Sequence, residues 1–140
     1  MGTFAAYGHA IVALAAMAAF GLILGPLSGM RKRVHGLTPG AEPKADYADP
    51  CYRWHRAQLN TAEIIGPFAA VVLAAILSGA NPFLVNLLAS LFFVSRLLLA
   101  FVHIKGIGKA DMSVRSFTYI AGWLMCILLA ILAISAVLGG

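Results

Sequence analysis

Three polar residues, Arg56, Asn60 and Glu63, lie within a long apolar part of the sequence. They belong to the segment HRAQLNTAEIIGPF, residues 55–68. At about 100° per residue, their side chains would fall within an arc of roughly 60° on one helix. An unpaired ion inside a bilayer costs about 3 kcal/mol on insertion scales, so an intramembrane ion indicates function by default.

A second buried ion is expected at the same depth as the first. Glu63 lies nine residues after Trp54, and Arg96 lies eight residues before Ile104. These spacings correspond to about 13 Å and 12 Å along two antiparallel helices. A Glu63–Arg96 ion pair, or a polar ligand between them, would reduce the cost of burying both charges.

Further polar side chains are expected near the same end of the membrane. His103 is seven residues after Arg96 and shares its helix face. Arg115 and Tyr119 form an i, i+4 pair, with Ser116 beside them. Three helices would therefore line one cavity in the cytoplasmic half, suited to a small, mostly anionic molecule with at least one amine.

Simpler roles stay open for several of these residues. Arginines near the interface, such as Arg56 and Arg115, can extend to the headgroups without binding a ligand. Gln58 and Asn60 can form hydrogen bonds between helices. A Glu63–Arg96 pair could also be purely structural.

The elements that carry these residues are expected to be membrane helices. The chain has 140 residues, of which 61% are hydrophobic and 11% charged, against about 25% charged residues in soluble domains. A crossing needs about 20 apolar residues. We predict an all-α membrane protein, a four-helix transmembrane bundle in a single domain over residues 1–140. Its spans are expected at about 4–27, 54–77, 82–104 and 114–138.

The net charge of +5 reflects topology rather than nucleic-acid binding. Basic residues cluster in or beside the first and third loops: Arg31, Lys32, Arg33, Lys44, Arg53, Lys105, Lys109 and Arg115. Cytoplasmic loops of membrane proteins carry an excess of such residues. Loops one and three are therefore predicted in the cytoplasm and both termini outside. No Lys or Arg precedes Arg31, so the first stretch is expected to be a retained span rather than a signal peptide.

The ends of two helices carry capping signals. Asn81 can cap the third helix with Pro82 at its first position, and Ser113 or Asp111 can cap the fourth. The first loop, from about Ser28 to Arg53, has no helical period. The two cysteines are spaced neither for a bridge nor for a metal site.

These motifs resemble those of the MAPEG family, the membrane-associated proteins of eicosanoid and glutathione metabolism. RAQLNTAE, followed by GPF, resembles the second-helix signature, closest to the leukotriene C synthase branch. RSFTY, residues 115–119, resembles the start of the fourth helix in the prostaglandin E synthase and microsomal glutathione transferase branches.

The resemblance implies a homotrimer of four-helix subunits, with glutathione as co-substrate bound between subunits and open to the cytoplasm. Arg115, with Ser116, would stabilise the glutathione thiolate, and a lipophilic second substrate would arrive from the bilayer. The residues implied to bind glutathione are Arg56, Gln58, Asn60, Glu63, Arg96, His103 and Tyr119. His103 stands where relatives commonly carry Tyr, and Leu99 where some carry His or Tyr.

The expected function is that of a glutathione-dependent transferase or peroxidase acting on lipophilic electrophiles or lipid hydroperoxides, in a bacterial inner membrane. Two alternatives stay open. One is a non-catalytic lipid-binding scaffold of the same fold. The other is a small transporter subunit that uses Glu63 and Arg96.

Overall fold

The chain is built from long helices. The computed structural model describes residues 2–108 and 112–139. A single turn, α1 (Gly2–Ala5), precedes α2 (Gly8–Val34), α3 (Pro50–Leu77), α4 (Pro82–Lys105) and α5 (Val114–Leu138), and these ranges contain no strand. Helices α2 to α5 are each long and apolar enough to cross a membrane. The prediction of an all-α protein with four spans is confirmed.

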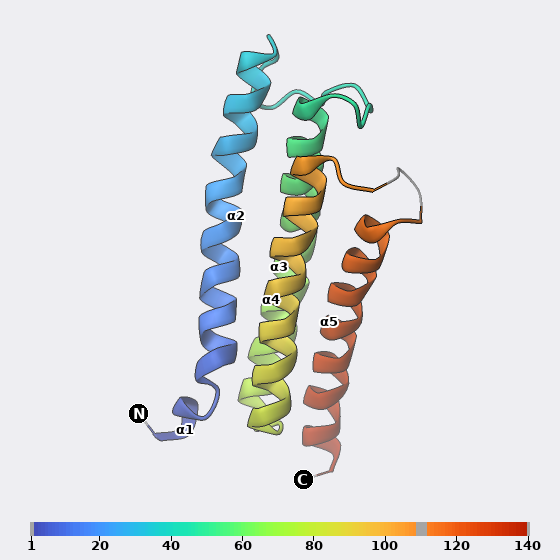
Figure 1. The fold of residues 1–140 in the computed structure, drawn as a ribbon. Coiled ribbons are helices and arrows are strands. Elements are labelled where there is room, and N and C mark those ends of the chain that lie inside the picture. The colour runs from blue at the N-terminus through green and yellow to red at the C-terminus, as the bar shows by residue number, and fades with distance from the viewer. Residues whose placement is uncertain (1, 109–111, 140) are drawn as a thin grey trace.

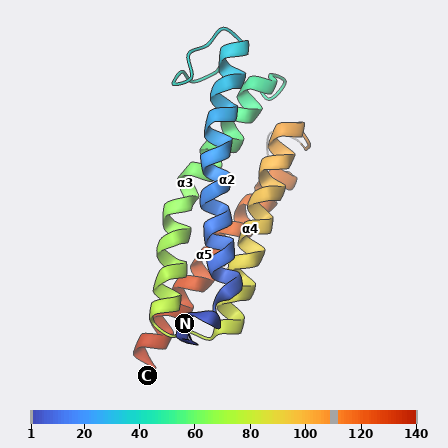
Figure 2. The same cartoon turned by 90° about the vertical axis from the view of Figure 1, so that its left-hand side faces the viewer.

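The four long helices are not arranged as equivalent neighbours. Helices α3 and α4 pack against each other, and α2 and α5 each pack against both of them. Figures 1 and 2 show α2 and α5 on different sides of this central pair. The two chain ends lie at one end of the bundle, and the loops after α2 and α4 lie at the other (Figure 1).

The first long helix differs from the expected span at both ends. It begins at Gly8 instead of residue 4 and continues to Val34 instead of residue 27. Arg31, Lys32 and Arg33 occupy its last turn, where cations interact favourably with the helix dipole. Hydropathy marks where the apolar stretch ends, but the helix continues past that point.

Helix α3 begins four residues earlier than expected. The Asp49 carboxylate accepts a hydrogen bond from the Cys51 backbone N–H (2.8 Å), and Pro50 takes the first helical position. Both residues stabilise a helix start, because the cap satisfies a free donor and proline has none to satisfy. The helix therefore starts at this cap, ahead of the apolar stretch.

The capping of α4 agrees with the sequence. The Asn81 side chain accepts from the Leu84 backbone N–H (3.2 Å), with Pro82 at the first position. Ser113 is the residue that precedes α5. Asp111, the other expected cap, and Lys109 lie outside the described residues.

An aromatic stack forms the centre of the core. Phe68 of α3 and Phe92 of α4 are fully buried, with ring centroids 3.9 Å apart and an interplanar angle of 11°. Leu129 of α5 is fully buried in the same cluster. Close van der Waals packing of these large side chains holds α3, α4 and α5 together.

The two tryptophans have different surroundings. Trp54 lies near the start of α3 under the Arg31 guanidinium, whose Cζ is 5.3 Å from the ring centroid. Trp123, in the middle of α5, is 51% exposed. Trp54 thus lies at the end of the bundle that carries the loops after α2 and α4, which we call the loop end. Trp123 faces outward partway along α5.

Candidate functional site

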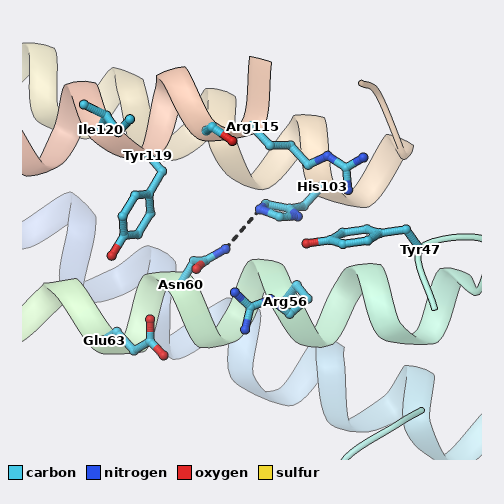
Figure 3. Close-up of a pocket in the computed structure, with 9 residues that line it drawn as sticks. Tyr47, Arg56, Asn60, Glu63, His103, Arg115, Tyr119 and Ile120 are labelled. Carbon is cyan, nitrogen blue, oxygen red and sulfur yellow. Dashed lines mark hydrogen bonds between the residues drawn. The ribbon is translucent and has the colours of Figure 1, made fainter. Parts of the chain in front are cut away.

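A polar cavity of about 440 Å³ lies between α3, α4 and α5 at the loop end of the bundle (Figure 3). This size falls within the range of roughly 300–1,000 Å³ that is typical of small-molecule sites. Its lining residues are Tyr47, Arg56, Asn60, Glu63, His103, Arg115, Ser116, Tyr119 and Ile120. The structure therefore brings together every candidate site residue except Gln58 and Arg96.

Helix α3 supplies one wall of the cavity. Arg56, Asn60 and Glu63 lie in a row along the helix face, as Figure 3 shows. Arg56 is half-buried, and its Nε atom has no hydrogen-bond partner among the described residues. Glu63 is exposed and forms no salt bridge within the described ranges. Both charged groups are therefore free to bind a ligand.

A hydrogen bond joins α3 to α4 inside the cavity. The Asn60 side-chain amide donates to His103 Nε2 (3.0 Å), and both residues are buried. With Nε2 as acceptor, the neutral ring carries its hydrogen on Nδ1, which has no partner in the part of the chain that is described. Leu99, one turn earlier on α4, is buried and offers no polar group.

Arg115 supplies the opposite wall from the start of α5. Its side chain is buried, and Nη2 donates to the Gly108 carbonyl (2.6 Å). Its Cζ lies 4.0 Å from the centroid of the Tyr47 ring. Nε and Nη1 are buried without partners among the residues described. Buried donors without acceptors are costly, so this guanidinium suits an anion at its free edge.

Ser116 and Tyr119 extend this wall along α5. Ser116 is half-buried, whereas Tyr119 is 39% exposed. Ile120 adds an apolar surface beside Tyr119. The cavity thus combines charged groups at the loop end with an apolar edge deeper in the bundle.

Arg96 is buried in a different place. It is 1% exposed, and its Nη2 donates to the backbone carbonyls of Tyr119 (2.7 Å) and Thr118 (3.4 Å). The guanidinium occupies the space beside Gly122, where an added Cβ would lie only 2.6 Å from Nε. Within the described ranges no ion pair joins Arg96 to Glu63. The expected pair does not form, because carbonyls on α5 serve as the acceptors instead.

Gln58 lies outside the cavity, on another side of α3. It borders a separate groove of about 370 Å³ against α2, with Ala18, Gly21, Leu22, Ala62 and Ile65. Two residues along a helix correspond to a rotation of about 200°. Helical geometry alone could therefore have separated Gln58 from the face that carries Arg56.

Tyr47 and the apolar Ile120 are the lining residues that the sequence reasoning missed. Tyr47 belongs to the loop between α2 and α3, and its ring lies nearly parallel to the His103 ring, at 20° with centroids 6.0 Å apart. The loop has no helical period, so sequence spacing offers no signal for its position. The only signal for a role of Tyr47 was its place as an aromatic residue shortly before the second long helix, whose first turns carry arginines.

The charges of the cavity define the ligand it suits. Two guanidinium groups, from Arg56 and Arg115, face one carboxylate, from Glu63. Opposite charges in a partly desolvated site attract strongly. The arrangement complements a small molecule with at least two anionic groups and one cationic group.

Comparison with known proteins provides a match that covers nearly the whole chain. Residues 9–135 match the sequence model of the MAPEG family. No curated protein matches the sequence at a significant level.

Proposed function

Because the chain belongs to the MAPEG family, we propose that it is a glutathione-dependent transferase or peroxidase acting on lipophilic substrates. Family membership fits a role in glutathione or eicosanoid metabolism, and four apolar helices fit an integral membrane protein. The proposal adds a defined ligand, a defined site and a reaction to this broader assignment.

Charge complementarity is the observation that carries the proposal. Glutathione has two carboxylates, one ammonium group and a thiol. The cavity offers the guanidinium groups of Arg56 and Arg115 and the carboxylate of Glu63. Glu63 would bind the ammonium group, and Arg56 and Asn60 would bind the carboxylate at the same end of the peptide. The Asn60 amide oxygen stays available for this contact, because the amide nitrogen is the atom that bonds His103.

Arg115 would stabilise the ionised form of the glutathione thiol. A thiolate is the reactive nucleophile, and an adjacent cation favours its formation. The buried Nε and Nη1 donors of Arg115 would stabilise the sulfur anion, with the Ser116 hydroxyl beside them. The thiolate attacks an electrophilic carbon and expels a leaving group. Alternatively, it attacks a peroxide oxygen, cleaves the O–O bond and releases the alcohol; the glutathione sulfenic acid that forms then reacts with a second glutathione to give the disulfide and water. The nucleophile belongs to the bound tripeptide, and both protein cysteines are buried.

The second substrate would reach the thiolate from the bilayer. Ile120 borders the cavity and is 51% exposed, and Phe117 is 64% exposed on the same helix. These side chains form an apolar approach beside the polar site. The basic residues near this end support a cytoplasmic position for the cavity, because cytoplasmic loops carry an excess of Lys and Arg. We propose a homotrimer in a bacterial inner membrane, with Gln58 and the α2–α3 groove at the contact between subunits.

The proposal is tested by titrating detergent-purified protein with glutathione and following thiolate formation by ultraviolet absorbance. We expect saturable thiolate formation and conjugation of a chlorodinitrobenzene. Arg115→Ala should abolish both signals, and Arg56→Ala should weaken glutathione binding about ten- to hundredfold. Lys105→Ala is the matched control, because Lys105 is an exposed cation at the end of α4 that does not line the cavity.

Other outcomes would overturn the proposal. Binding to the parent protein no tighter than to Arg56→Ala would exclude this glutathione site. Thiolate formation without conjugation or peroxide reduction would indicate a binding scaffold. Solute flux in proteoliposomes that Glu63→Gln abolishes would indicate a transporter.

A further inference from the structure

Tyr47 links the loop between α2 and α3 to the cationic wall of the cavity. Its ring centroid lies 4.0 Å from Arg115 Cζ, and its ring stacks on His103. We propose that Tyr47 is a positioning residue that holds the Arg115 guanidinium with its free edge toward the ligand. The ligand is glutathione only if the proposed function is correct, but the positioning itself does not depend on that function.

The contacts of Arg115 determine which donors stay available. The Tyr47 ring lies against the guanidinium, and the Gly108 carbonyl accepts from Nη2 at 2.6 Å. Together these two contacts fix the plane and the rotation of the group. Nε and Nη1 are the buried donors without partners among the described residues. Donors held in one direction stabilise a developing anion better than mobile ones, since they need no reorganisation.

The backbone at Tyr47 is itself held in place by Arg53 of α3, which also reaches α4. Arg53 Nη1 donates to the Tyr47 carbonyl (2.9 Å) and to the Ala48 carbonyl (3.0 Å). Arg53 Nε donates to the Ile104 carbonyl (3.3 Å) near the end of α4. Arg53 therefore ties the loop that carries Tyr47 to the helix that carries His103.

The ring, and not the hydroxyl, is the part of Tyr47 that this role requires. Figure 3 shows the ring lying alongside His103 and the hydroxyl pointing into the cavity. A ring against a cation attracts it through its π face, which phenylalanine also has. Tyr47→Phe should therefore preserve the positioning, whereas Tyr47→Leu should remove it.

The first test measures the reactivity of Arg115 without any glutathione. The purified protein is treated with phenylglyoxal, and modification of Arg115 is quantified by peptide mass spectrometry. Tyr47→Leu should increase the rate about three- to tenfold, since one face of the guanidinium loses its cover, and Tyr47→Phe should return it to nearly the parent value. Exposed Arg33 provides an internal reference that should not change.

The second test measures thiolate formation with bound glutathione. Tyr47→Leu should reduce the thiolate fraction near neutral pH about three- to tenfold, as expected for the loss of one cation–π contact. Affinity for S-methylglutathione, which has no ionisable thiol, should change less than about twofold. A merely structural defect would weaken both ligands together.

The outcomes separate the two proposals. Absence of thiolate in the parent protein overturns the proposed function, and the phenylglyoxal test still decides the role of Tyr47. Equal Arg115 reactivity in the parent and Tyr47→Leu overturns the positioning role. A defect in Tyr47→Phe as large as that in Tyr47→Leu also overturns it. If Tyr47→Leu does not fold, Arg53→Met releases the same loop and should raise Arg115 reactivity; no rise would refute the inference.

Discussion

Replacement of Gly122 by alanine should destabilise the protein, although alanine is the better helix former. Arg96 fills the space beside Gly122, with Nε 2.6 Å and Cζ 2.7 Å from the position of an added Cβ. The guanidinium is buried and cannot move outward to solvent without leaving the Tyr119 carbonyl. The substitution therefore forces Arg96 out of its site.

The magnitude follows from three contributions. Losing a hydrogen bond from a charged donor costs about 1.5–3 kcal/mol. Overpacking a tight site costs about 1–3 kcal/mol more. The higher helix propensity of alanine offsets about 1 kcal/mol of this loss. We expect a net loss of about 1.5–5 kcal/mol, which corresponds to a melting temperature lowered by about 5–25 °C, at about 3–5 °C per kcal/mol for a chain of this size.

The assay is thermal unfolding in detergent, followed by circular dichroism. Gly29→Ala in α2 is the matched control, because its nearest neighbour to an added Cβ is Pro39 at an ordinary 3.4 Å, and it should be neutral or stabilising. Combining Gly122→Ala with Arg96→Met should recover about 1–3 kcal/mol, since the guanidinium is gone. If Gly122→Ala is as stable as the parent, or the double variant recovers nothing, the inferred packing of Arg96 against α5 is wrong.

Three further predictions concern the cavity and the two ends of the bundle. Glu63→Gln should weaken glutathione binding about ten- to hundredfold but leave N-acetylglutathione binding unchanged in calorimetry, because the acetylated ligand has no ammonium group. Asn86→Ala should lower stability by about 1–3 kcal/mol in thermal unfolding, because its side chain donates to the Ala6 carbonyl (2.8 Å) and accepts from the Ala10 N–H (2.9 Å). Arg53→Met should speed hydrogen exchange in the loop around Tyr47, because that loop loses its ties to α4.

Each of these predictions has a result that contradicts it. Equal weakening of both glutathione forms by Glu63→Gln would place the ammonium group elsewhere. An Asn86→Ala melting temperature equal to that of the parent would mean that its two bonds do not hold the first turn of α2 and the residues just before it to α4. Unchanged exchange in Arg53→Met, with Lys44→Met as the control for removal of an exposed loop cation, would show that other contacts hold the loop.

The sequence predicted the helices well because one physical pattern determines them. Apolar length fixes the number of crossings, and the Asn81 cap located the start of α4. The start of α3 was expected four residues too late, because its cap at Asp49 precedes the apolar stretch. The end of α2 was misplaced, because hydropathy falls at Arg31 while backbone hydrogen bonding continues to Val34. A helix can extend beyond the lipid, so polarity alone does not end it.

The site was predictable where residues share one helix and less so where they do not. The spacing of Arg56 and Glu63 placed both on the same face of α3. Arg96 was expected beside Glu63 from depth alone, but depth does not specify which neighbouring helix a long side chain reaches. That choice depends on a small residue opposite, Gly122. The position of Tyr47 depends on the hydrogen bond that Arg53 donates to this loop, and no sequence periodicity predicts such a contact.

Because Trp54 and Trp123 have different surroundings, their fluorescence can measure how deeply α5 lies in the bilayer. Brominated acyl chains quench tryptophan emission on contact, so Trp123 should report direct exposure to lipid while Trp54, under Arg31, should not. In a variant that keeps only Trp123, bromine placed at successive carbons of the chain would locate the middle of α5 within the bilayer. Shielding of that signal would reveal a neighbouring subunit seated against the outer face of α5.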